Sequence, residues 1–452
     1  MLSNNASLIY GILMGAGARS AAHLIKRTSL SQPMISRALG ELARHTEHLV
    51  IHRSGRQILY ALTRQIRALP AAIPVYTVAA APDIGVAHLL GTLSALQGGG
   101  TLFVAGEKSE LLDGLPWFIQ DMRPQGYIGR AFCRAQAQPL GLSDRLAEWS
   151  EDDVICALAA LGDDTSGNLI LGDAALQRYL SHDPHPPAHR SLDSLAVFFD
   201  RLAEAAVQGG APGSSAAGEH PKFLTQYSTR KKIRHVIVKF SPLQDSSAAA
   251  TRWQDLLIAE HIASAVLGAH GVAVPDTQII ISKKRCYLES KRFDRVGPKG
   301  RISTVTFAAI DNAFIGAHRN WGQSATFLSA RGMIDTGCEN EIHLLEAFGR
   351  LIGNTDMHFG NLSFHWEILN GQIKLRLAPI YDMLPMLYAP EKSEVTHRSF
   401  NPTLPESLVS KPSAAISMAQ NFWARVAAHQ KVSAAFREIA CDNAALLAQW
   451  KK

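Results

Sequence analysis

The sequence predicts an α+β protein, in which a small helical module at the N-terminus precedes a mixed region and a largely helical C-terminal part. The chain has 452 residues, which at about 150 residues per domain favours roughly three domains. Residues 1–68 show helical periodicity and then a hairpin pattern, and residues 70–180 mix short apolar runs with turn residues. From about residue 221 onward strand patterns come first, and helical periodicity then continues to the end.

The bulk composition is that of a globular protein. Hydrophobic residues make up 47% of the chain and charged residues 19%. No run reaches the roughly 18 apolar residues that a membrane span needs, and residues 1–17 lack the basic start and apolar core of a signal peptide. The five cysteines are scattered without a pair at metal-ligand spacing, which indicates reduced thiols. We therefore expect a cytoplasmic protein with no membrane partner, and its net charge of +6 permits an anionic one.

Two runs rich in Pro, Gly, Ser and Ala, at residues 181–187 and 209–218, interrupt the periodic segments and are typical of loops. Together with the change of pattern near residue 69 they divide the chain. The predicted domains are a winged helix-turn-helix module at 1–68, a subdomain at 70–180, a small α/β lobe at 190–300 and a helical lobe at 301–452.

The first segment has the pattern of a helix, a turn and a second helix. Residues 20–26 suit a short helix, and residues 28–31 suit a turn. Ser31 can cap the second helix, and Pro33 falls in its first turn, where a missing N–H costs little.

The second helix is predicted to be amphipathic. Ile35, Leu39 and Leu42 repeat at i, i+4 and i+7, which predicts one buried stripe. The other faces carry side chains of the types that contact bases and phosphates, namely Gln32, Ser36, Arg37 and Arg44.

A hairpin with a basic tip follows the two helices. Residues 49–53 and 57–62 flank a Ser-Gly turn, with Arg53 and Arg56 on either side. Helix, turn, helix and basic hairpin resemble a winged helix-turn-helix domain, which implies DNA binding with the second helix in a major groove. Such modules commonly act as symmetric dimers on palindromic sites. The alternative is a small helical module used for packing or protein contacts.

The most specific motif lies at residues 353–361, where Asp356 and Asn361 stand at the spacing D-x-x-x-x-N. Phosphoryl transfer uses a carboxylate that accepts the proton of the substrate hydroxyl, and an amide oxygen that helps to hold a metal ion. A short loop with both groups can place them around one phosphate. The spacing alone is a weak signal, because it occurs by chance in many chains.

A second acidic element follows about twenty residues later. Residues 377–381 form an apolar, strand-like run that ends in Asp382 before a turn. Kinases place their main metal carboxylate in such a position, although an isolated aspartate there is more often a cap or turn residue. The two elements in this order favour a phosphoryl-transfer site.

Upstream residues supply the remaining parts of such a site. Residues 234–240 read as a buried strand that contains Lys239, and Glu260 lies in an apolar helix that follows. A lysine there can reach the α- and β-phosphates of ATP, and a helix carboxylate can position it. The alternatives are a lysine that extends to solvent at a strand end and a glutamate on a solvated helix face.

At this point the chain resembles a known family. The segments KF at 239–240, AEHIASAVLGAHGVAVPD at 259–276, RFDR at 292–295, GNTDMHFGN at 353–361 and APIYDMLP at 378–385 look, in this order, like HipA-family serine/threonine kinase toxins. The fused N-terminal module is similar to the YjjJ-type (HipH) members. The resemblance implies a kinase-like fold with ATP and Mg²⁺ as cofactors, a protein substrate and autophosphorylation.

The resemblance also implies residue roles. Asp356 would be the catalytic base, Asn361 and Asp382 the magnesium ligands, and Lys239 the phosphate-binding residue that Glu260 positions. Phe293 would lie in the nucleotide site, and His358 would support the catalytic loop. The run Ser215, Ala216, Ala217 and Gly218 looks like the family's phosphate loop, with Ser215 as the autophosphorylation site; a flexible linker is the alternative.

Two departures from the family pattern bear on the nucleotide. Lys291 stands where an acidic residue usually precedes RFDR, which puts the nucleotide preference in question. Glu219 and His220 replace more neutral residues after the phosphate loop, and a carboxylate so near a triphosphate is mildly unfavourable.

Three functions are compatible with these residues. The first is a toxin kinase that phosphorylates Ser or Thr of a protein, with its own DNA-binding module. The second is a Mg²⁺-dependent nuclease that uses the same carboxylates on DNA. The third is a transcriptional regulator that senses nucleotide without turnover. The full set of phosphoryl-transfer residues favours the first.

Overall fold

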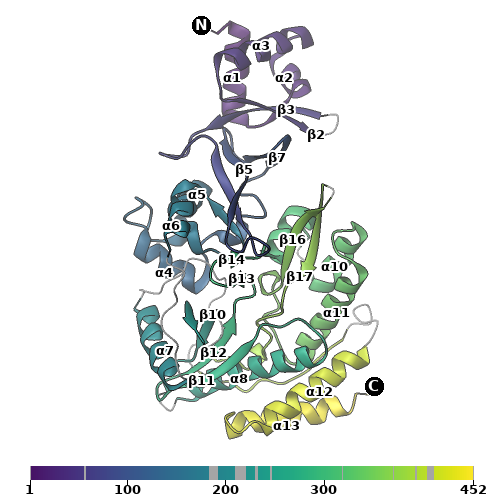
Figure 1. The fold of residues 1–452 in the computed structure, drawn as a ribbon. Coiled ribbons are helices and arrows are strands. Elements are labelled where there is room, and N and C mark those ends of the chain that lie inside the picture. Colours follow the sequence, from purple (N-terminus) through teal and green to yellow (C-terminus); the bar gives the residue numbers. More distant parts are fainter. Residues whose placement is uncertain are drawn as a thin grey trace.

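The computed structural model describes residues 2–54, 57–182, 192–208, 220–229, 233–244, 247–317, 319–369, 371–391, 394–404 and 412–450. Within these ranges the protein mixes helices and sheets, as the sequence predicts (Figure 1). No helix among them is both long and apolar enough to cross a membrane.

The N-terminal module contains three helices and a hairpin. Its elements are α1 (Asn4–Ala16), β1 (Arg19–Ser20), α2 (Ala21–Thr28), α3 (Gln32–His45), β2 (Leu49–Ser54) and β3 (Gln57–Arg64). Ile35, Leu39 and Leu42 of α3 are buried, as the periodicity predicts, and they pack with Ile9 of α1 and Leu24 of α2. The two helices and the hairpin thus lie where the sequence predicts them, and α1 is a further helix.

One detail at the start of α3 differs from the sequence prediction. Ser31 occupies the N-cap position, but its side chain makes no capping hydrogen bond there. Pro33 lies in the first turn of α3, so one of the free N–H groups that a cap would serve is already absent. In α2, by contrast, the Ser20 side chain accepts a hydrogen bond from the His23 main-chain nitrogen.

The hairpin of β2 and β3 is part of a sheet that continues into the middle of the chain. Strand β3 pairs antiparallel with β5, with Thr63 opposite Leu96 and Arg64 opposite Ala95. The Arg64 guanidinium also binds both carboxylate oxygens of Asp152, at 2.6 and 2.7 Å. In Figure 1 this long strand β5 connects the N-terminal module to the body below it.

Residues 73–181 complete this eight-stranded sheet and add three helices. The elements are β4 (Ile73–Val78), β5 (Ala87–Leu96), β6 (Thr101–Ala105), β7 (Lys108–Leu112), α4 (Gly126–Gln136), α5 (Glu151–Leu161), β8 (Leu169–Leu171) and α6 (Asp173–Ser181). In the sheet order β1-β3-β5-β4-β8, strands β5 and β4 lie between β3 of the N-terminal module and β8 of the middle region.

The small lobe contains a four-stranded antiparallel sheet in the order β11-β12-β10-β9. Its elements are α7 (Leu192–Val207), β9 (Lys222–Ser228), β10 (Ile233–Phe240), α8 (Ala248–Ala269), β11 (Thr277–Ile281) and β12 (Cys286–Lys291). Phe223, Val238 and Tyr287 point to one face and pack against α7. Because strand side chains alternate, Lys222 and Lys239 lie on the opposite face.

The C-terminal lobe is largely helical, with a three-stranded sheet at one side. Its elements are β13 (Arg295–Val296), β14 (Gly300–Arg301), β15 (Val305–Thr306), α9 (Phe307–Ile310), α10 (Trp321–Ala330), α11 (Thr336–Leu351), β16 (Ser363–Leu369), β17 (Gln372–Leu377), α12 (Pro412–Ala428) and α13 (Ala434–Ala448). Two buried helices, α8 and α11, join the lobes through one shared hydrophobic core.

A buried ionic network joins the middle region to the link between the lobes. The carboxylate of Asp294 accepts two hydrogen bonds from Arg292, one from Arg295 and one from the Gly167 main-chain nitrogen. Arg292 and Arg295 also bind the Asp164 carboxylate. Burial alone would raise the pKa of Asp294, but the two arginines outweigh burial and hold that pKa well below its usual range.

We predict that Asp294→Asn lowers the free energy of unfolding by about 3–5 kcal/mol, because it leaves buried arginines without their partner. The depressed pKa of Asp294 means that this contribution is present above about pH 4 and is lost as the pH falls further. Urea unfolding at pH 7 and pH 3 measures both effects. Asp442→Asn, at an exposed position of α13, is the matched control, and an equal effect of the two variants would contradict the prediction.

Candidate active site

Three side chains from distant parts of the chain meet in the cleft between the lobes. Lys239 of β10 lies between Glu260 of α8 and Asp382, which follows β17. The Lys239 Nζ donates to both Glu260 carboxylate oxygens, at 2.6 and 2.7 Å, and to Asp382 Oδ1 at 2.5 Å. Lys239 and Glu260, which the sequence analysis paired, are thus in direct contact, and Asp382 is a second partner of Lys239.

The electrostatics of this triad follow from burial and from the single cation. Burial would lower the pKa of Lys239, but Asp382 and Glu260 raise it above its usual value, so the ammonium is charged. Burial would raise the pKa of Asp382, but Lys239 and Lys222 bring it below its usual value. Burial raises the pKa of Glu260 despite Lys239. The two lysines therefore favour the ionised form of Asp382.

The loop at residues 353–361 is held by its own polar groups. The Asn354 side chain donates to the Asp382 carbonyl at 3.2 Å and accepts from the Asp356 main-chain nitrogen at 3.1 Å. Asn361 Nδ2 donates to the Asp356 carbonyl at 2.7 Å, so this bond engages the amide nitrogen and not the amide oxygen. His358 Nδ1 accepts from the Gly360 nitrogen at 3.0 Å. His358 thus shapes the loop, while the Asp356 carboxylate is exposed to solvent.

The segment that ends at Asp382 differs from the sequence prediction. Strand β17 stops at Leu377, and the following residues lack strand pairing. Pro379 has no N–H to donate, and the Ile380 nitrogen donates instead to the Ala273 carbonyl. Asp382 itself has a φ of 57°, a left-handed conformation that is uncommon outside glycine. Such backbone conformations cluster at functional sites.

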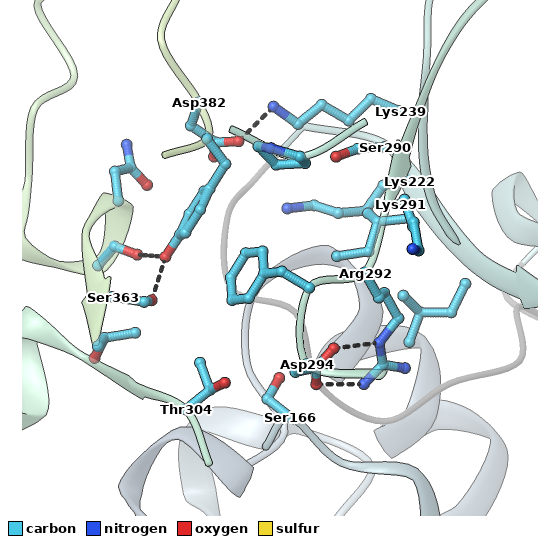
Figure 2. A pocket seen from close by; sticks show the side chains of 18 of the residues that line it. Ser166, Lys222, Lys239, Ser290, Lys291, Arg292, Asp294, Thr304, Ser363 and Asp382 are labelled. Carbon is cyan, nitrogen blue, oxygen red and sulfur yellow. Dashed lines mark hydrogen bonds and ion pairs between the residues drawn. The ribbon is translucent and has the colours of Figure 1, made fainter. Parts of the chain in front are cut away.

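A cavity with an empty volume of about 1020 Å³, part of it open to solvent, extends from this triad. Figure 2 shows Lys239 and Asp382 at one end of it, and Arg292, Asp294, Ser166 and Thr304 at the other. Apolar side chains of the small lobe also line it, namely Leu224, Ile237 and Leu288. The lining therefore combines charged, polar and apolar side chains.

Phe293 and Lys291, both singled out in the sequence, line this cavity. Phe293 stacks on Tyr381, with ring centroids 5.9 Å apart. The Tyr381 hydroxyl hydrogen-bonds Ser363 Oγ at 2.7 Å and the Gly360 carbonyl at 2.9 Å. Phe293 is thereby tied to the loop that carries Asn361, while the Lys291 side chain is exposed.

Sequence reasoning missed several residues of the cavity. Lys222 lies directly opposite Lys239 in the β9–β10 register and is buried beside it. Asp121, Gln125 and Ser166 line the cavity from the middle region. The Asp121 carboxylate accepts from the Thr306 main-chain nitrogen at 2.5 Å and hydroxyl at 2.8 Å. Of these residues, Lys222 alone has a signal in the sequence, because it follows the Gly-rich run at residues 209–218 and begins a strand.

The remaining predicted site residues fall into three groups. Ser215, Ala216, Ala217, Gly218 and Glu219 lie outside the described residues, as does Arg56 of the hairpin tip. His220 is described: burial and then Lys239 lower its pKa to about 3, so its imidazole is neutral. The predicted DNA-contacting side chains of the N-terminal module are all exposed to solvent, namely Gln32, Ser36, Arg37, Arg44 and Arg53.

Comparisons with known proteins agree with this organisation. Residues 69–180 match the family described as the YjjJ-like toxin middle domain, and residues 214–449 match the HipA-like C-terminal domain. The chain is 36% identical over 433 residues to Toxin YjjJ of Escherichia coli strain K12, covering 95% of this chain and 94% of that protein. The chain belongs to the YjjJ-like toxin family.

Solved structures also show some likeness to this YjjJ-like chain. A chain of the Shewanella oneidensis MR-1 complex of HipA, HipB and operator DNA is 15% identical, with a TM-score of 0.47 over 80% of this chain and 94% of that one. The Helicobacter pylori proinflammatory kinase CtkA is 14% identical, with a TM-score of 0.34 over 52% of this chain and 89% of that one.

We predict that Lys239→Met destabilises this YjjJ-like chain by about 3–5 kcal/mol at pH 8, because it removes the cation between two buried carboxylates. Burial already raises the pKa of Glu260, and without the ammonium the folded state favours the protonated acid further. A raised folded-state pKa means that stability is recovered as the pH falls from 8 toward 5.

Urea unfolding of wild type and variant at both pH values measures this effect. Lys239→Met combined with Glu260→Gln is the control, since it removes one of the two unpaired charges and is expected to narrow the difference between the pH values. A deficit in the single variant that does not change with pH would contradict the ionic explanation.

Proposed function

We propose that this chain is a HipA-like toxin kinase that transfers the γ-phosphate of ATP to Ser or Thr of a protein, itself included. The observation that carries the proposal is the contact of Lys239 with Glu260 and Asp382 at one end of the cavity between the lobes. The same arrangement of a strand lysine, a helix glutamate and a metal-binding aspartate is required for phosphoryl transfer in kinases.

The residues present fit a magnesium ion. Asp382 offers an ionised carboxylate and Asn361 an amide oxygen, and Mg²⁺ prefers such oxygen ligands. Among the described residues no group of three or more His, Cys, Asp or Glu side chains converges, which suits an ion that takes its other ligands from phosphates and water. The bound ion would neutralise negative charge on the β- and γ-phosphates.

The chain's own residues then have separate roles. Lys239 and Lys222, side by side on adjacent strands, would bind phosphate oxygens. Asp356, whose side chain is exposed and which precedes Asn361 in the loop, would orient the acceptor hydroxyl and accept its proton. Asn361 would bind the metal ion, and its side chain also donates a hydrogen bond to the Asp356 carbonyl. The position of the proposed base would therefore be set by a proposed metal ligand.

We predict that Asp356→Ala and Asp382→Asn each lower phosphate transfer about a hundredfold or more, the scale of a lost general base or metal ligand. Purified protein is incubated with labelled ATP and Mg²⁺, and the label on the chain itself and on added proteins is followed by mass spectrometry, including at Ser215. Asp442→Asn, which lies on the exposed face of α13, is expected to behave as wild type.

The same preparation distinguishes the competing functions. Plasmid nicking that is lost in Asp382→Asn would show that the chain is a nuclease and not a kinase. Tight ATP binding without transfer to any protein would favour a nucleotide-sensing regulator. Either result would overturn the proposed kinase activity.

We propose in addition that the N-terminal module binds DNA. The supporting observation is that α3 and the hairpin expose Gln32, Arg37, Arg44 and Arg53 while the apolar stripe of α3 is buried. Arginine is the residue type most suited to phosphate and guanine contacts.

We predict that binding to random duplex DNA weakens with salt, and that Arg37→Ala with Arg44→Ala lowers the slope of log K against log salt by about one for each lost phosphate contact. Fluorescence anisotropy over a range of KCl concentrations measures the slope. Arg425→Ala, an exposed arginine of α12, is the control. A flat slope for the wild-type protein would exclude phosphate contacts.

A further inference from the structure

A second cavity is lined by a different part of the loop at residues 353–361 than the first. It is lined by Asn320, Trp321, Glu346, Arg350, Asn354, Thr355, Asp356, Met357 and His358, and its empty volume is about 760 Å³ including open solvent. Asp356 lines this cavity but not the nucleotide cavity, whereas Asn361 and Asp382 line the nucleotide cavity. The proposed base therefore faces a separate space, where an acceptor can approach.

Within this cavity the guanidinium of Arg350 is fixed in place by a buried carboxylate. Arg350 Nε and Nη2 donate to Glu346 Oε1, at 3.2 and 2.8 Å. The other oxygen of Glu346 accepts from the Gly322 main-chain nitrogen at 2.8 Å. Glu346 is only 3% exposed, so both of its oxygens are engaged inside the protein and it is not available to a ligand.

One edge of the Arg350 guanidinium remains open toward the cavity. The Arg350 side chain is 34% exposed, and its Nη1 atom makes no hydrogen bond to any residue that the structure describes. Setting His358 aside, Arg350 is the one cationic side chain among the described residues that line this cavity. A planar guanidinium that is held in place binds carboxylate groups with little further loss of side-chain freedom.

The walls of the cavity are also connected to the catalytic loop. The Asn320 side chain caps α10 by accepting from the Gln323 nitrogen at 2.8 Å. Trp321 Nε1 donates to the His358 carbonyl at 3.3 Å. Helices α10 and α11 therefore hold Arg350 and Asp356 on one rigid frame, so that a side chain bound at Arg350 fixes where its neighbour lies relative to the base.

We propose that this second cavity is the acceptor site and that Arg350 selects protein segments with an acidic side chain close to the Ser or Thr that is phosphorylated. The inference rests on the proposed kinase function and adds the substrate class to it. Arg350 is a specificity residue, because it contacts the acceptor segment and not the reacting atoms.

The test uses a set of peptides with one central Ser or Thr, in which each flanking position carries in turn Asp, Ala or Lys. We expect the full-length wild-type protein to phosphorylate peptides with Asp at one or two flanking positions about tenfold more efficiently in kcat/KM than the Lys peptides, the scale of one charge-assisted hydrogen bond. In Arg350→Gln the ratio between Asp and Lys peptides falls toward one.

Two further variants guard against a loss of folding. Arg350→Lys keeps the charge beside Glu346 but lacks the planar fork, and we expect it to retain part of the selectivity. Glu346→Gln with Arg350→Gln avoids a buried, unpaired carboxylate and is expected to lose selectivity like the single variant. Arg425→Gln removes the same charge from an exposed site on α12 and keeps the wild-type ratio.

Binding gives an independent result. Fluorescence anisotropy with a labelled Asp peptide and its Lys counterpart, without ATP, is expected to show preferred binding of the Asp peptide that Arg350→Gln abolishes. Wild-type protein that transfers phosphate or binds peptide without an acidic preference, or a preference unchanged in Arg350→Gln, overturns this inference and leaves the kinase intact. Acid-selective binding without transfer to any protein contradicts the kinase and supports the site.

Discussion

The ammonium of Lys239 is the interaction on which the arrangement of this cleft depends. It connects a strand of the small lobe, the helix α8 behind it, and a segment of the C-terminal lobe 143 positions further along the chain. Two buried carboxylates would repel each other and lose their hydration. A buried cation between them is therefore needed to stabilise this arrangement of side chains. The ionised Asp382 that results is the group a divalent ion requires.

The middle region contributes to this site as well as to the overall shape. Asp121 holds the start of α9, while Gly167 donates to Asp294 in the segment that links the lobes. Helix α4 also reaches the back of the small-lobe sheet, where Tyr127 lies 6.5 Å from Phe240. The middle region thus touches both lobes and the link between them, so the cavity has a wall that a two-lobed body alone would lack.

The candidate phosphoryl-transfer residues could be singled out from the sequence because their signals are local. Asp356 and Asn361 lie in one loop, and Lys239 lies near the end of an apolar strand pattern at residues 234–240. Lys222 was missed because its position depends on strand register, and Asp121 because its partner Thr306 is 185 positions away. The sequence predicts a strand that reaches Asp382, whereas β17 ends at Leu377. The apolar pattern does not reveal that the Ile380 nitrogen donates to the Ala273 carbonyl and not to a neighbouring strand. Arg350 gave no local signal, because its orientation depends on the buried Glu346.

The pairing of β3 with β5 has a consequence for how the N-terminal module can be handled. Strand β3 of the hairpin is hydrogen-bonded to β5, so the N-terminal module and the body share one sheet. A fragment that begins near residue 69 would lack β3 and would expose the backbone edge of β5 that β3 covers. It would also expose Leu96 and Leu102, which pack against Ala61 of β3. Open edges of this kind favour aggregation. The hairpin also follows any tilt of the large sheet, so its orientation is a property of the whole molecule.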